Sequence, residues 1–347
     1  MSGAVRLVPR GKAAPKIPDV FRPVTAAEIE ERLRHVDTKS FTIWDGAPRL
    51  SVAGVQTKLN VLKRGNEYGL AQGEQLASDR ILKFEKPALR HLVVNEFLTM
   101  HLATSLGHAV APTKLLRVGA FRALEVMRFD RRVAEADGQL VVKRRPVIDA
   151  CQALGKTSSL KYECPFGRGY EAKPLSLGVS FGALCGLAAH AADPLAMVTE
   201  LLDWRLFNLI VGNTDAHGKN LSFFVSRRGL AVAPWYDLVS VELIDGVDHA
   251  LAMGVDDEFD PDQVHALQLL YDAEAAGLEK AIVPRRLALV VERLKAGLAT
   301  ALAEAVELDE EERAFAADYQ RFVESKIARW EWELAVMPAL LADATLF

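Results

Sequence analysis

Apolar positions along the first third of the chain follow two different periods. Helical spacing predicts a helix that begins after Thr25, with Glu28 completing a capping box, and a second helix at residues 92–106 that ends at Gly107. Short apolar runs bounded by turn signals predict strands at residues 41–44, 50–53, 58–63, 80–84, 113–118 and 123–129. Strands interrupted by few helices indicate an α+β lobe over residues 23–130.

The hydrophobic pattern beyond residue 130 is mainly that of helices. Asp193 and Pro194 mark the start of a helix that runs to residue 211 and stops at Gly212. After a polar loop we expect a hairpin with strands at residues 221–225 and 230–233. Three more helices are then expected, at residues 261–275, 284–306 and 309–336. Residues 131–347 should therefore form a mainly helical lobe. Residues 1–22, rich in Pro, Gly and basic side chains, should form a flexible arm before both lobes.

Composition narrows the class of protein. With 347 residues, of which 50% are apolar and 25% charged, the chain is typical of a globular protein with two domains or one two-lobed unit. A formal net charge of -4 supplies no basic field for a nucleic acid backbone, which argues against direct DNA binding. Three cysteines without a Cys-x-x-Cys pair, no secretory signal and no membrane-length apolar run lead us to expect reduced thiols and a cytoplasmic location.

The densest group of polar residues lies in the loop at residues 212–220, between a helix stop and a strand. Phosphoryl transfer needs a carboxylate for the hydroxyl proton, oxygen ligands for magnesium and a cation on the phosphates. Asp215 and Asn220 have the D-x-x-x-x-N spacing of a kinase base and metal ligand, and Asp237 follows the hairpin as a second metal ligand would. Taken singly, the three could be a turn residue, a helix C-cap and a helix N-cap. Their combination points to phosphoryl transfer.

Two further side chains of this loop are candidate nucleotide contacts. His217 lies two residues after Asp215, an arrangement closer to phosphatidylinositol-type kinases than to ordinary protein kinases. It is either a hydrogen-bonding residue of the loop or a donor to a phosphate or to Asp237. Lys219 is the second candidate contact.

The first lobe must then supply a phosphate-binding loop and a lysine. Backbone N–H groups of Ala53, Gly54 and Val55 could cradle phosphate oxygens, although neither glycine-rich phosphate motif is present. Lys83 lies in an apolar strand, where a buried ammonium needs an anion such as phosphate, and Glu96 could orient it. Alternatively, Lys83 is an edge-strand lysine kept for solubility.

Together these segments resemble the HipA family, the serine/threonine kinase toxins of bacterial toxin–antitoxin operons. The resemblance implies a two-lobed, protein-kinase-like fold related to phosphatidylinositol kinases, with an all-α C-terminal lobe. It covers roughly residues 48–255 and is carried by short motifs in a shared order: Ser51-Val-Ala-Gly-Val-Gln56, Ile81-Leu-Lys83, Asn95-Glu96, Arg128-Phe-Asp-Arg131, Cys151-Gln152, Lys161-Tyr-Glu163, Thr214-Asp-Ala-His-Gly-Lys-Asn220, Pro234-Trp-Tyr-Asp237 and Leu251-Ala-Met-Gly254.

The resemblance also implies a role for each matching residue. Ser51 matches the serine that these kinases autophosphorylate, and a phosphate there would add about −1.5 to −2 charges to a loop meant to receive ATP phosphates. The remaining roles are the catalytic base for Asp215, the magnesium ligands for Asn220 and Asp237, the phosphate lysine for Lys83, a nucleotide contact for His217 and the adenine-side linker for Phe129.

Cofactors and partners follow from the same resemblance. It implies that the protein uses ATP and Mg²⁺ and binds a helix-turn-helix antitoxin, and that it contacts DNA only through this antitoxin. The implied substrate is a translation component such as an aminoacyl-tRNA synthetase. The segment before the phosphate loop is shorter than in the family's long form. The chain therefore looks like the short toxin form, whose missing piece is a separate small protein that would dock on exposed apolar surface.

Two departures from the family pattern leave other functions open. Met127 replaces the linker glutamate, and Val147 and Ile148 replace the Gln and Glu expected before Asp149. These changes slightly favour a non-catalytic, kinase-like corepressor bound to an antitoxin. The D-x-H-x-x-N loop would also suit a small-molecule or lipid kinase, although the chain offers no basic amphipathic helix for a lipid surface.

Overall fold

The chain divides into two compact units in the computed structural model. The structure describes residues 10–11, 17–36, 41, 43–45, 47–48, 56–86, 89–136, 138–165 and 176–343. Unit 1 comprises Met1–Phe97 and Ala111–Val147, and unit 2 comprises Leu98–Val110 and Ile148–Phe347. The chain passes between these units more than once, whereas the sequence prediction divides the two lobes at a single boundary near residue 130.

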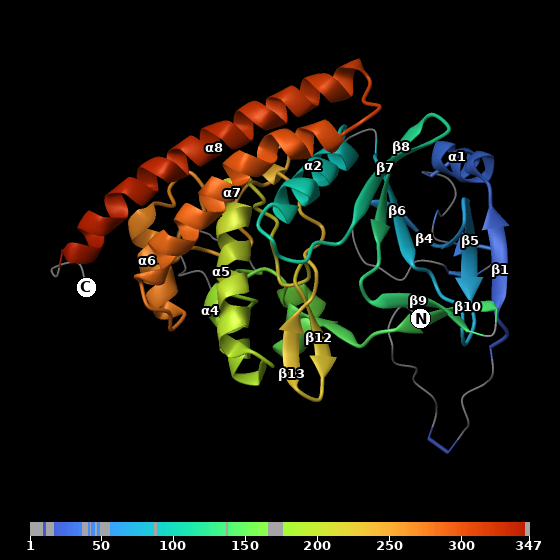
Figure 1. Ribbon diagram of the computed structural model, residues 1–347, viewed down its shortest axis with the longest axis horizontal. Helices are drawn as coiled ribbons and strands as arrows, with labels where there is room; N and C mark the ends of the chain where they lie inside the picture. The colour runs from blue at the N-terminus through green and yellow to red at the C-terminus, as the bar shows by residue number, and fades with distance from the viewer. Residues whose placement is uncertain are drawn as a thin grey trace. The chain divides into compact units, whose positions relative to one another are not determined.

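Unit 1 is built on a six-stranded antiparallel sheet with the strand order β1-β5-β4-β6-β8-β7 (Figure 1). Its strands are β1 (Val20–Val24), β4 (Thr57–Arg64), β5 (Glu67–Gln72), β6 (Arg80–Phe84), β7 (Thr113–Val118) and β8 (Phe121–Met127). The predictions for β6 and β7 are confirmed at both ends. β1 begins inside the segment expected to be a flexible arm, so that expectation is wrong for its last three residues.

Helix α1 (Ala26–Arg34) covers one face of this sheet. Ile29 and Leu33 are buried against Leu82 and Phe84, in a core that also contains Trp44 of the short hairpin β2 (Ile43–Trp44) and β3 (Ala47–Pro48). Because side chains alternate along a strand, Lys83 lies on the opposite face of β6 from Leu82 and Phe84.

The start of α1 corrects one sequence prediction. The hydroxyl of Thr25 accepts a hydrogen bond from the backbone N–H of Glu28 at 3.2 Å, which confirms the N-cap. The side chain of Glu28 pairs with Arg22, at 2.6 and 3.0 Å, where a capping box would have it bond the backbone of Thr25. β1, which carries Arg22, was not predicted, so this competing partner was not visible in the sequence.

A further hairpin of unit 1 lies beyond the expected lobe boundary at residue 130. It consists of β9 (Arg131–Ala136) and β10 (Gln139–Arg144). Val142 is buried with Leu62, Leu76 and Ala77 of the same unit, and its backbone N–H bonds Gln75 at 2.7 Å. This packing attaches the hairpin to unit 1.

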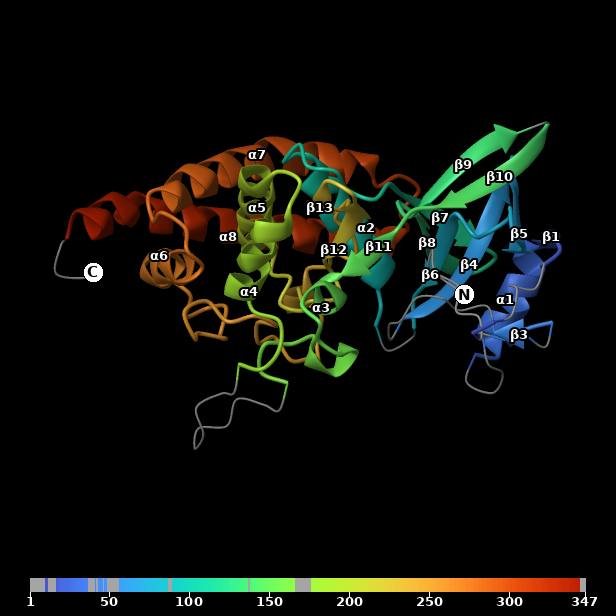
Figure 2. The same ribbon diagram turned by 90° about the horizontal axis from the view of Figure 1, so that it is seen from below.

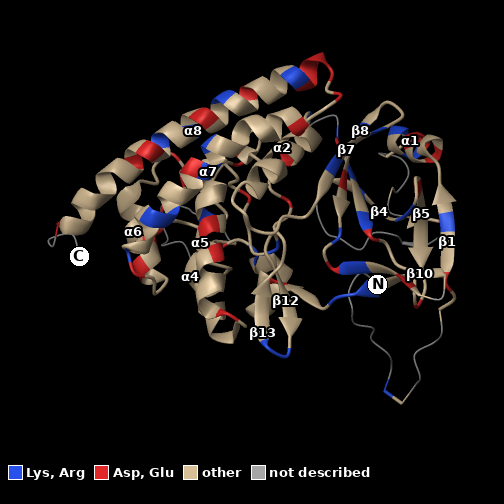
Figure 3. Cartoon of the chain, viewed as in Figure 1, with Lys and Arg blue, Asp and Glu red and all other residues tan. Residues whose placement is uncertain are grey.

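Unit 2 is mainly helical. Its long helices are α5 (Pro194–Ile210), α7 (Ile282–Glu304) and α8 (Glu310–Ala342), and α7 and α8 run side by side in both views (Figures 1 and 2). Asp193 caps α5 as predicted, accepting from Ala196 at 3.0 Å. The acidic residues Glu310, Glu311 and Glu312 occupy the first turn of α8, where negative charge is favoured by the helix dipole (Figure 3).

The shorter elements of unit 2 include some that the hydrophobic pattern did not reveal. The hairpin β12 (Ser222–Ser226) and β13 (Gly229–Val232) was predicted, but β11 (Val147–Asp149) extends it to a three-stranded sheet, so the lobe is not all-α. Helix α2 (Leu92–Thr104) begins in unit 1 and ends in unit 2. The remaining helices are α3 (Ala150–Ala153), α4 (Phe181–Gly186), α6 (Ala266–Ala275) and the short 3₁₀ turns Ser158–Leu160, Leu187–His190 and Val241–Leu243.

Two further features concern the cysteines and the possibility of a membrane-spanning helix. Cys151, Cys164 and Cys185 form no disulfide bond with one another. Among the described residues, no helix combines the length and the apolar character that a membrane span requires.

Candidate active site

The polar loop of unit 2 begins where α5 stops at a glycine. Gly212 has a φ of 66°. A Cβ there would lie 2.8 Å from the ring of Phe322 and 3.0 Å from Oε1 of Glu242. Both the left-handed backbone and the close neighbours favour glycine at this position. The chain therefore turns sharply from the helix into residues 213–220.

Hydrogen bonds to neighbouring segments hold this loop in place. Asn213 donates to the side chain of Asn208 at 2.6 Å, and the carbonyl of Thr214 accepts from Ala252 at 2.8 Å. Within the loop, Asn220 N–H donates to the carbonyl of His217 at 2.8 Å. A buried irregular loop must satisfy its backbone groups in this way, and the result is a defined conformation.

Asp215 is the exposed residue of an otherwise largely buried loop. Its Oδ1 accepts a hydrogen bond from the hydroxyl of Tyr162 at 2.8 Å. The carboxylate is thus anchored through one oxygen and open to solvent. This suits a base that must meet an incoming hydroxyl group.

Asn220 and Asp237 are brought together by the β12–β13 hairpin. Nδ2 of Asn220 donates to the backbone carbonyl of Asp237 at 3.4 Å. Asp237 has a φ of 58°, a left-handed conformation that is uncommon outside glycine and clusters at functional sites. Next to it, the hydroxyl of Tyr236 donates to the carbonyl of Lys219 at 2.6 Å and contacts Ser222 at 2.8 Å. These bonds fix the end of the hairpin beside the loop.

The donor set of this pair fits magnesium. The hydrogen bond from Asn220 uses its amide nitrogen, which leaves the amide oxygen as the atom for a metal ion. Asp237 adds a carboxylate. Mg²⁺ prefers oxygen ligands and is commonly held by one or two protein groups together with substrate phosphates and water.

His217 is buried, and its environment favours the neutral ring. Burial lowers the pKa of His217 and the charge of Lys161 lowers it further, against the opposing effect of Asp215 and Asp237. Nδ1 accepts the backbone N–H of Lys219 at 3.3 Å. Nε2 therefore carries the proton and is the donor of this ring. Both alternatives from the sequence are compatible with this: the ring bonds the loop through one nitrogen and can donate through the other.

Lys219 is engaged within unit 2. Its ammonium pairs with Asp149 at 2.6 Å. Asp149 also caps α3 by accepting from Gln152 at 2.9 Å, with Gln152 bonding back to its backbone. The predicted nucleotide contact of Lys219 stays a prediction, and the role of Asp149 was not foreseen.

A cluster of buried and half-buried polar groups holds Trp235, two residues before Asp237. Its indole Nε1 donates to Glu200 at 3.2 Å, its backbone N–H donates to Ala109 at 2.8 Å, and its ring stacks on His108 with centroids 5.1 Å apart. His108 in turn bonds Asp203 at 2.6 Å. The position of Asp237 is thus tied to helix α5 through Trp235.

Arg286 of α7 completes this cluster with two bonds to Asp203, one of them at 2.8 Å. Burial alone would raise the pKa of Asp203, but the hydrogen bonds from His108 and Arg286 and their positive charge outweigh it. The net effect is a lowered pKa. Asp203 is therefore a permanently ionised centre of the cluster at neutral pH.

The predicted lysine of unit 1 lies at the centre of the sheet. β6 pairs with β4 on one side and β8 on the other, so the alternative of an edge-strand lysine is wrong. Lys83 is 4% exposed and forms an ion pair with Glu96, which is 1% exposed, as proposed from the sequence. Lys58 of β4 lies directly opposite Lys83 in the register and is also buried.

That second lysine was missed by the sequence reading, which assigned no role to Lys58. Like charges directly opposite each other on neighbouring strands are destabilising. Two buried ammonium groups in this register require nearby negative charge, which Glu96 supplies to Lys83. The signal was the Thr57-Lys58 dipeptide after the small-residue loop, but its partner could be recognised only from the strand register.

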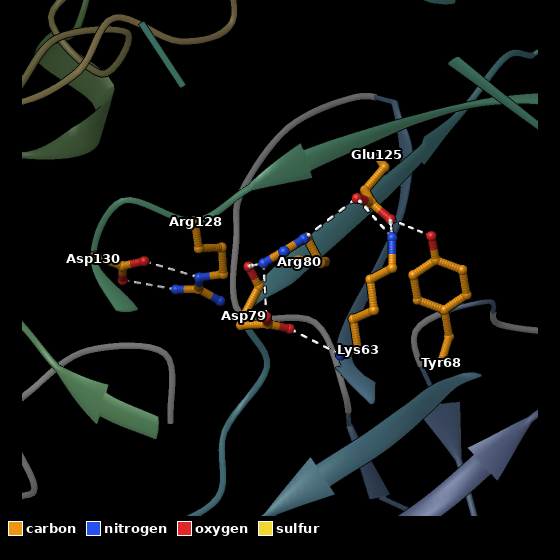
Figure 4. A network of polar contacts seen from close by, with 7 residues as sticks. All are labelled: Lys63, Tyr68, Asp79, Arg80, Glu125, Arg128 and Asp130. Carbon is orange, nitrogen blue, oxygen red and sulfur yellow. Dashed lines mark hydrogen bonds and ion pairs between the residues drawn. The ribbon is translucent and has the colours of Figure 1, made fainter. Parts of the chain in front are cut away.

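Phe129, the predicted adenine-side residue, lies in a turn braced by its neighbours. Arg128 forms two parallel bonds to Asp130 at 2.9 and 2.8 Å, and its backbone N–H bonds Asp79 at 3.0 Å (Figure 4). The turn is rigid, and the role of Phe129 stays a prediction.

Asp79 connects this turn to a second set of contacts on the sheet. Its carboxylate pairs with Arg80 at 2.6 Å, and Arg80 contacts Glu125 at 3.3 Å (Figure 4). Glu125 also receives Lys63 at 3.2 Å and the hydroxyl of Tyr68. Burial and the neighbouring carboxylate raise the pKa of Tyr68, so its phenol remains a donor.

The remaining predicted site residues cannot be placed. Ser51, Ala53, Gly54 and Val55 lie outside the described residues.

Sequence comparisons identify similar proteins over nearly the whole chain. A family model described as the HipA-like C-terminal domain matches residues 50–302. The serine/threonine-protein kinase toxin HipA of Shewanella oneidensis is 43% identical over 329 residues, covering 95% of this chain and 74% of that protein. A putative kinase of Sinorhizobium fredii, Y4mE, is 31% identical over 312 residues, covering 89% of this chain and 71% of that protein.

Solved structures give the same picture. HipA from the Shewanella oneidensis toxin–antitoxin complex with HipB and operator DNA matches with a TM-score of 0.86 and 42% identity, covering 97% of this chain and 77% of that one. The Helicobacter pylori proinflammatory kinase CtkA matches with a TM-score of 0.52 at 12% identity, covering 84% and 93%. The second likeness shows the fold alone. Together they confirm the predicted α+β, kinase-like fold.

Proposed function

The chain belongs to the HipA-like kinase family, and from that premise we propose that it transfers the γ-phosphoryl group of ATP to protein serine or threonine hydroxyls as the toxin of a bacterial toxin–antitoxin system. The family is one of serine/threonine protein kinases. One observation carries the assignment of the site. A buried loop presents a single solvent-exposed carboxylate, Asp215, beside the paired oxygen donors Asn220 and Asp237.

Asp215 acts as the general base. The oxygen of the acceptor hydroxyl forms a bond to the γ-phosphorus of ATP while the bond from that phosphorus to the bridging oxygen breaks. The hydroxyl proton passes to Asp215, and ADP leaves with the bridging oxygen. Asp215 suits this role because its carboxylate is both anchored and accessible.

The other residues bind and orient. Asn220 and Asp237 hold magnesium, which supplies charge neutralisation on the phosphates when bound. Lys83 and Lys58 of unit 1 supply positive charge for the nucleotide phosphates, with Glu96 keeping Lys83 charged and in place. His217 offers its Nε2–H to a phosphate oxygen, and Phe129 contacts the adenine.

Substrate and regulation follow the family expectation. We take the acceptor to be a translation component such as an aminoacyl-tRNA synthetase, and Ser51 to be an autophosphorylation site. Phosphate on Ser51 would repel the ATP phosphates and switch the enzyme off. Support for a helix-turn-helix antitoxin partner comes from the related toxin, which was solved together with HipB and operator DNA.

Intact mass spectrometry after incubation with Mg-ATP tests this proposal. We expect the wild-type chain to gain the mass of one phosphate, which peptide mapping places on Ser51. Asp215→Asn should gain phosphate about 10²–10⁴-fold more slowly, because a positioned base contributes about that factor. The thermal stability of this variant should be unchanged, since Asp215 is exposed.

Asp215→Asn that still gains phosphate at the wild-type rate would refute the assigned base. A wild-type chain that binds no ATP in the presence of magnesium, yet binds its antitoxin, would support the corepressor instead.

A further inference from the structure

The Lys161-Tyr162-Glu163 tripeptide lies alongside the active-site loop, and the family resemblance attaches no role to it. Its backbone is bonded at both ends to segments of that site. The carbonyl of Lys161 accepts from Gly218 of the loop at 2.9 Å, and Glu163 N–H donates to Ala252 at 2.9 Å. Ala252 itself donates to the carbonyl of Thr214 at 2.8 Å, next to the base. The tripeptide and the loop are thus joined on both sides of Tyr162.

Glu163 strengthens this attachment. Its Oε2 accepts the backbone N–H of Gly254 at 2.9 Å, and its Oε1 accepts the hydroxyl of Ser176 at 2.7 Å. The opposite side of the tripeptide is closed by Gly178, where a Cβ would lie 1.6 Å from the carbonyl oxygen of Tyr162. The backbone at Tyr162 therefore has little room to move.

The side chain of Tyr162 is also held. Its ring meets the edge of His217 with centroids 5.3 Å apart at 75°, and the ammonium of Lys161 lies 4.5 Å from its centroid. Its hydroxyl donates to Oδ1 of Asp215 at 2.8 Å. No other hydrogen bond to the Asp215 carboxylate is seen in the described part of the chain.

We propose that Tyr162 is a positioning residue of the transfer reaction, whose hydroxyl holds one oxygen of Asp215 so that the other meets the acceptor hydroxyl. This inference rests on the proposed function, because it assigns Tyr162 a task only if Asp215 is the base. An exposed aspartate on its own would rotate about its side-chain bonds and spend part of its time in unproductive orientations. Fixing one oxygen removes that freedom before the acceptor arrives.

The hydroxyl of Tyr162 remains a hydrogen-bond donor at neutral pH. Tyr162 is 37% exposed, but the partial burial of its ring and the adjacent charge of Asp215 both raise the pKa of Tyr162, so the phenol keeps its proton near neutral pH. Because backbone and ring are both held, Tyr162 is not built to swing away as a lid would. A positioning role therefore accounts for the contacts better than a removable block of the base.

Tyr162→Phe tests the proposal by deleting the hydroxyl while keeping the ring. With the full chain at saturating Mg-ATP, we expect the rate of phosphate transfer to fall about tenfold, which is less than the roughly 10²–10⁴-fold contribution of a positioned base because Asp215 itself remains. The dissociation constant for ATP should stay within twofold and the Tm should not change. Tyr271→Phe, the same change in a half-buried tyrosine of α6, is the matched control and should leave the rate unaltered.

The double variant Tyr162→Phe/Asp215→Asn separates positioning from a general structural effect. If Tyr162 acts through Asp215, the double variant transfers phosphate at the residual rate of Asp215→Asn alone. A further tenfold loss would show that Tyr162 acts elsewhere and would overturn the proposal.

Other outcomes are equally decisive. An unchanged rate in Tyr162→Phe overturns positioning, and a faster rate shows that the hydroxyl blocks the base. A fall in rate matched by a fall in Tm or in ATP affinity assigns Tyr162 a structural role. Failure of the proposed function is distinguishable, because Asp215→Asn would then retain the wild-type rate.

Discussion

Lys83 of unit 1 and Asp215 of unit 2 are held in place by opposite means. Lys83 is 4% exposed on a central strand and is neutralised by a permanent counter-ion, Glu96. Asp215 is exposed, and its orientation depends on a loop tied down by backbone hydrogen bonds and on one tyrosine hydroxyl. A cation that is buried in an apolar sheet needs an anionic partner to remain charged. A base that must meet a hydroxyl from solvent needs access and a fixed direction. The role proposed for Lys83 is therefore coupled to stability, whereas the role proposed for Asp215 is coupled only to rate.

Among substitutions at these sites, Glu96→Ala should cause the largest loss in the free energy of unfolding. Removing one partner of a buried ion pair leaves an uncompensated charge and costs about 3–5 kcal/mol of the free energy of unfolding. Chemical denaturation of the variant measures this loss. The double variant Lys83→Met/Glu96→Leu should recover most of the stability without recovering phosphate transfer. If Glu96→Ala lowered the free energy of unfolding by less than about 1 kcal/mol, the buried ion pair would not be more important for stability than the exposed Asp215.

Asp203→Asn tests whether the same rule holds for a buried acid of unit 2. Asp203 bonds His108 and Arg286, and losing bonds to charged groups should cost about 1.5–3 kcal/mol at pH 7. The pKa of Asp203 is lower in the folded chain than in the unfolded chain. Ionised Asp203 therefore stabilises the fold at pH values above the unfolded-state pKa of about 4, and this stabilisation is lost as the pH falls below that value.

The stability of the wild-type chain should therefore drop more steeply than that of Asp203→Asn between pH 5 and pH 3. Urea titrations at a series of pH values compare the two slopes. Parallel curves would mean that Asp203 is not ionised in the way its partners imply.

Thr25→Ala should show a smaller effect than changes at either buried acid, because Thr25 lies at an exposed helix start. Loss of the N-cap of α1 should cost about 1 kcal/mol. Glu28→Gln is its control and should cost less, since its pair with Arg22 is partly exposed and such pairs contribute about 0–1 kcal/mol. Differential scanning calorimetry measures both. An equal or larger cost for Glu28→Gln would show that this surface pair stabilises α1 more than the cap does.

The sequence alone was sufficient to predict the structural features that depend on residues close together in the chain. The strand at Arg80–Phe84, the cap of Asp193 on α5 and the hairpin after the polar loop all follow from periodicity or from residue types that act on their immediate neighbours. The D-x-x-x-x-N spacing with a following aspartate could also be recognised in the sequence, because it involves short separations along the chain. The partnership of Lys83 with Glu96 could also be predicted, since a lysine in an apolar strand requires an anion.

Only the tertiary structure decided which distant residues meet. Lys58 opposite Lys83 depends on strand register, and the pairing of Glu28 with Arg22 depends on a strand that the pattern did not reveal. Tyr162 reaches Asp215 across many intervening residues. Such contacts arise from the packing of whole elements, which no local rule of spacing encodes. The sequence therefore determines the chemistry available, and the packed chain determines which groups can perform it together.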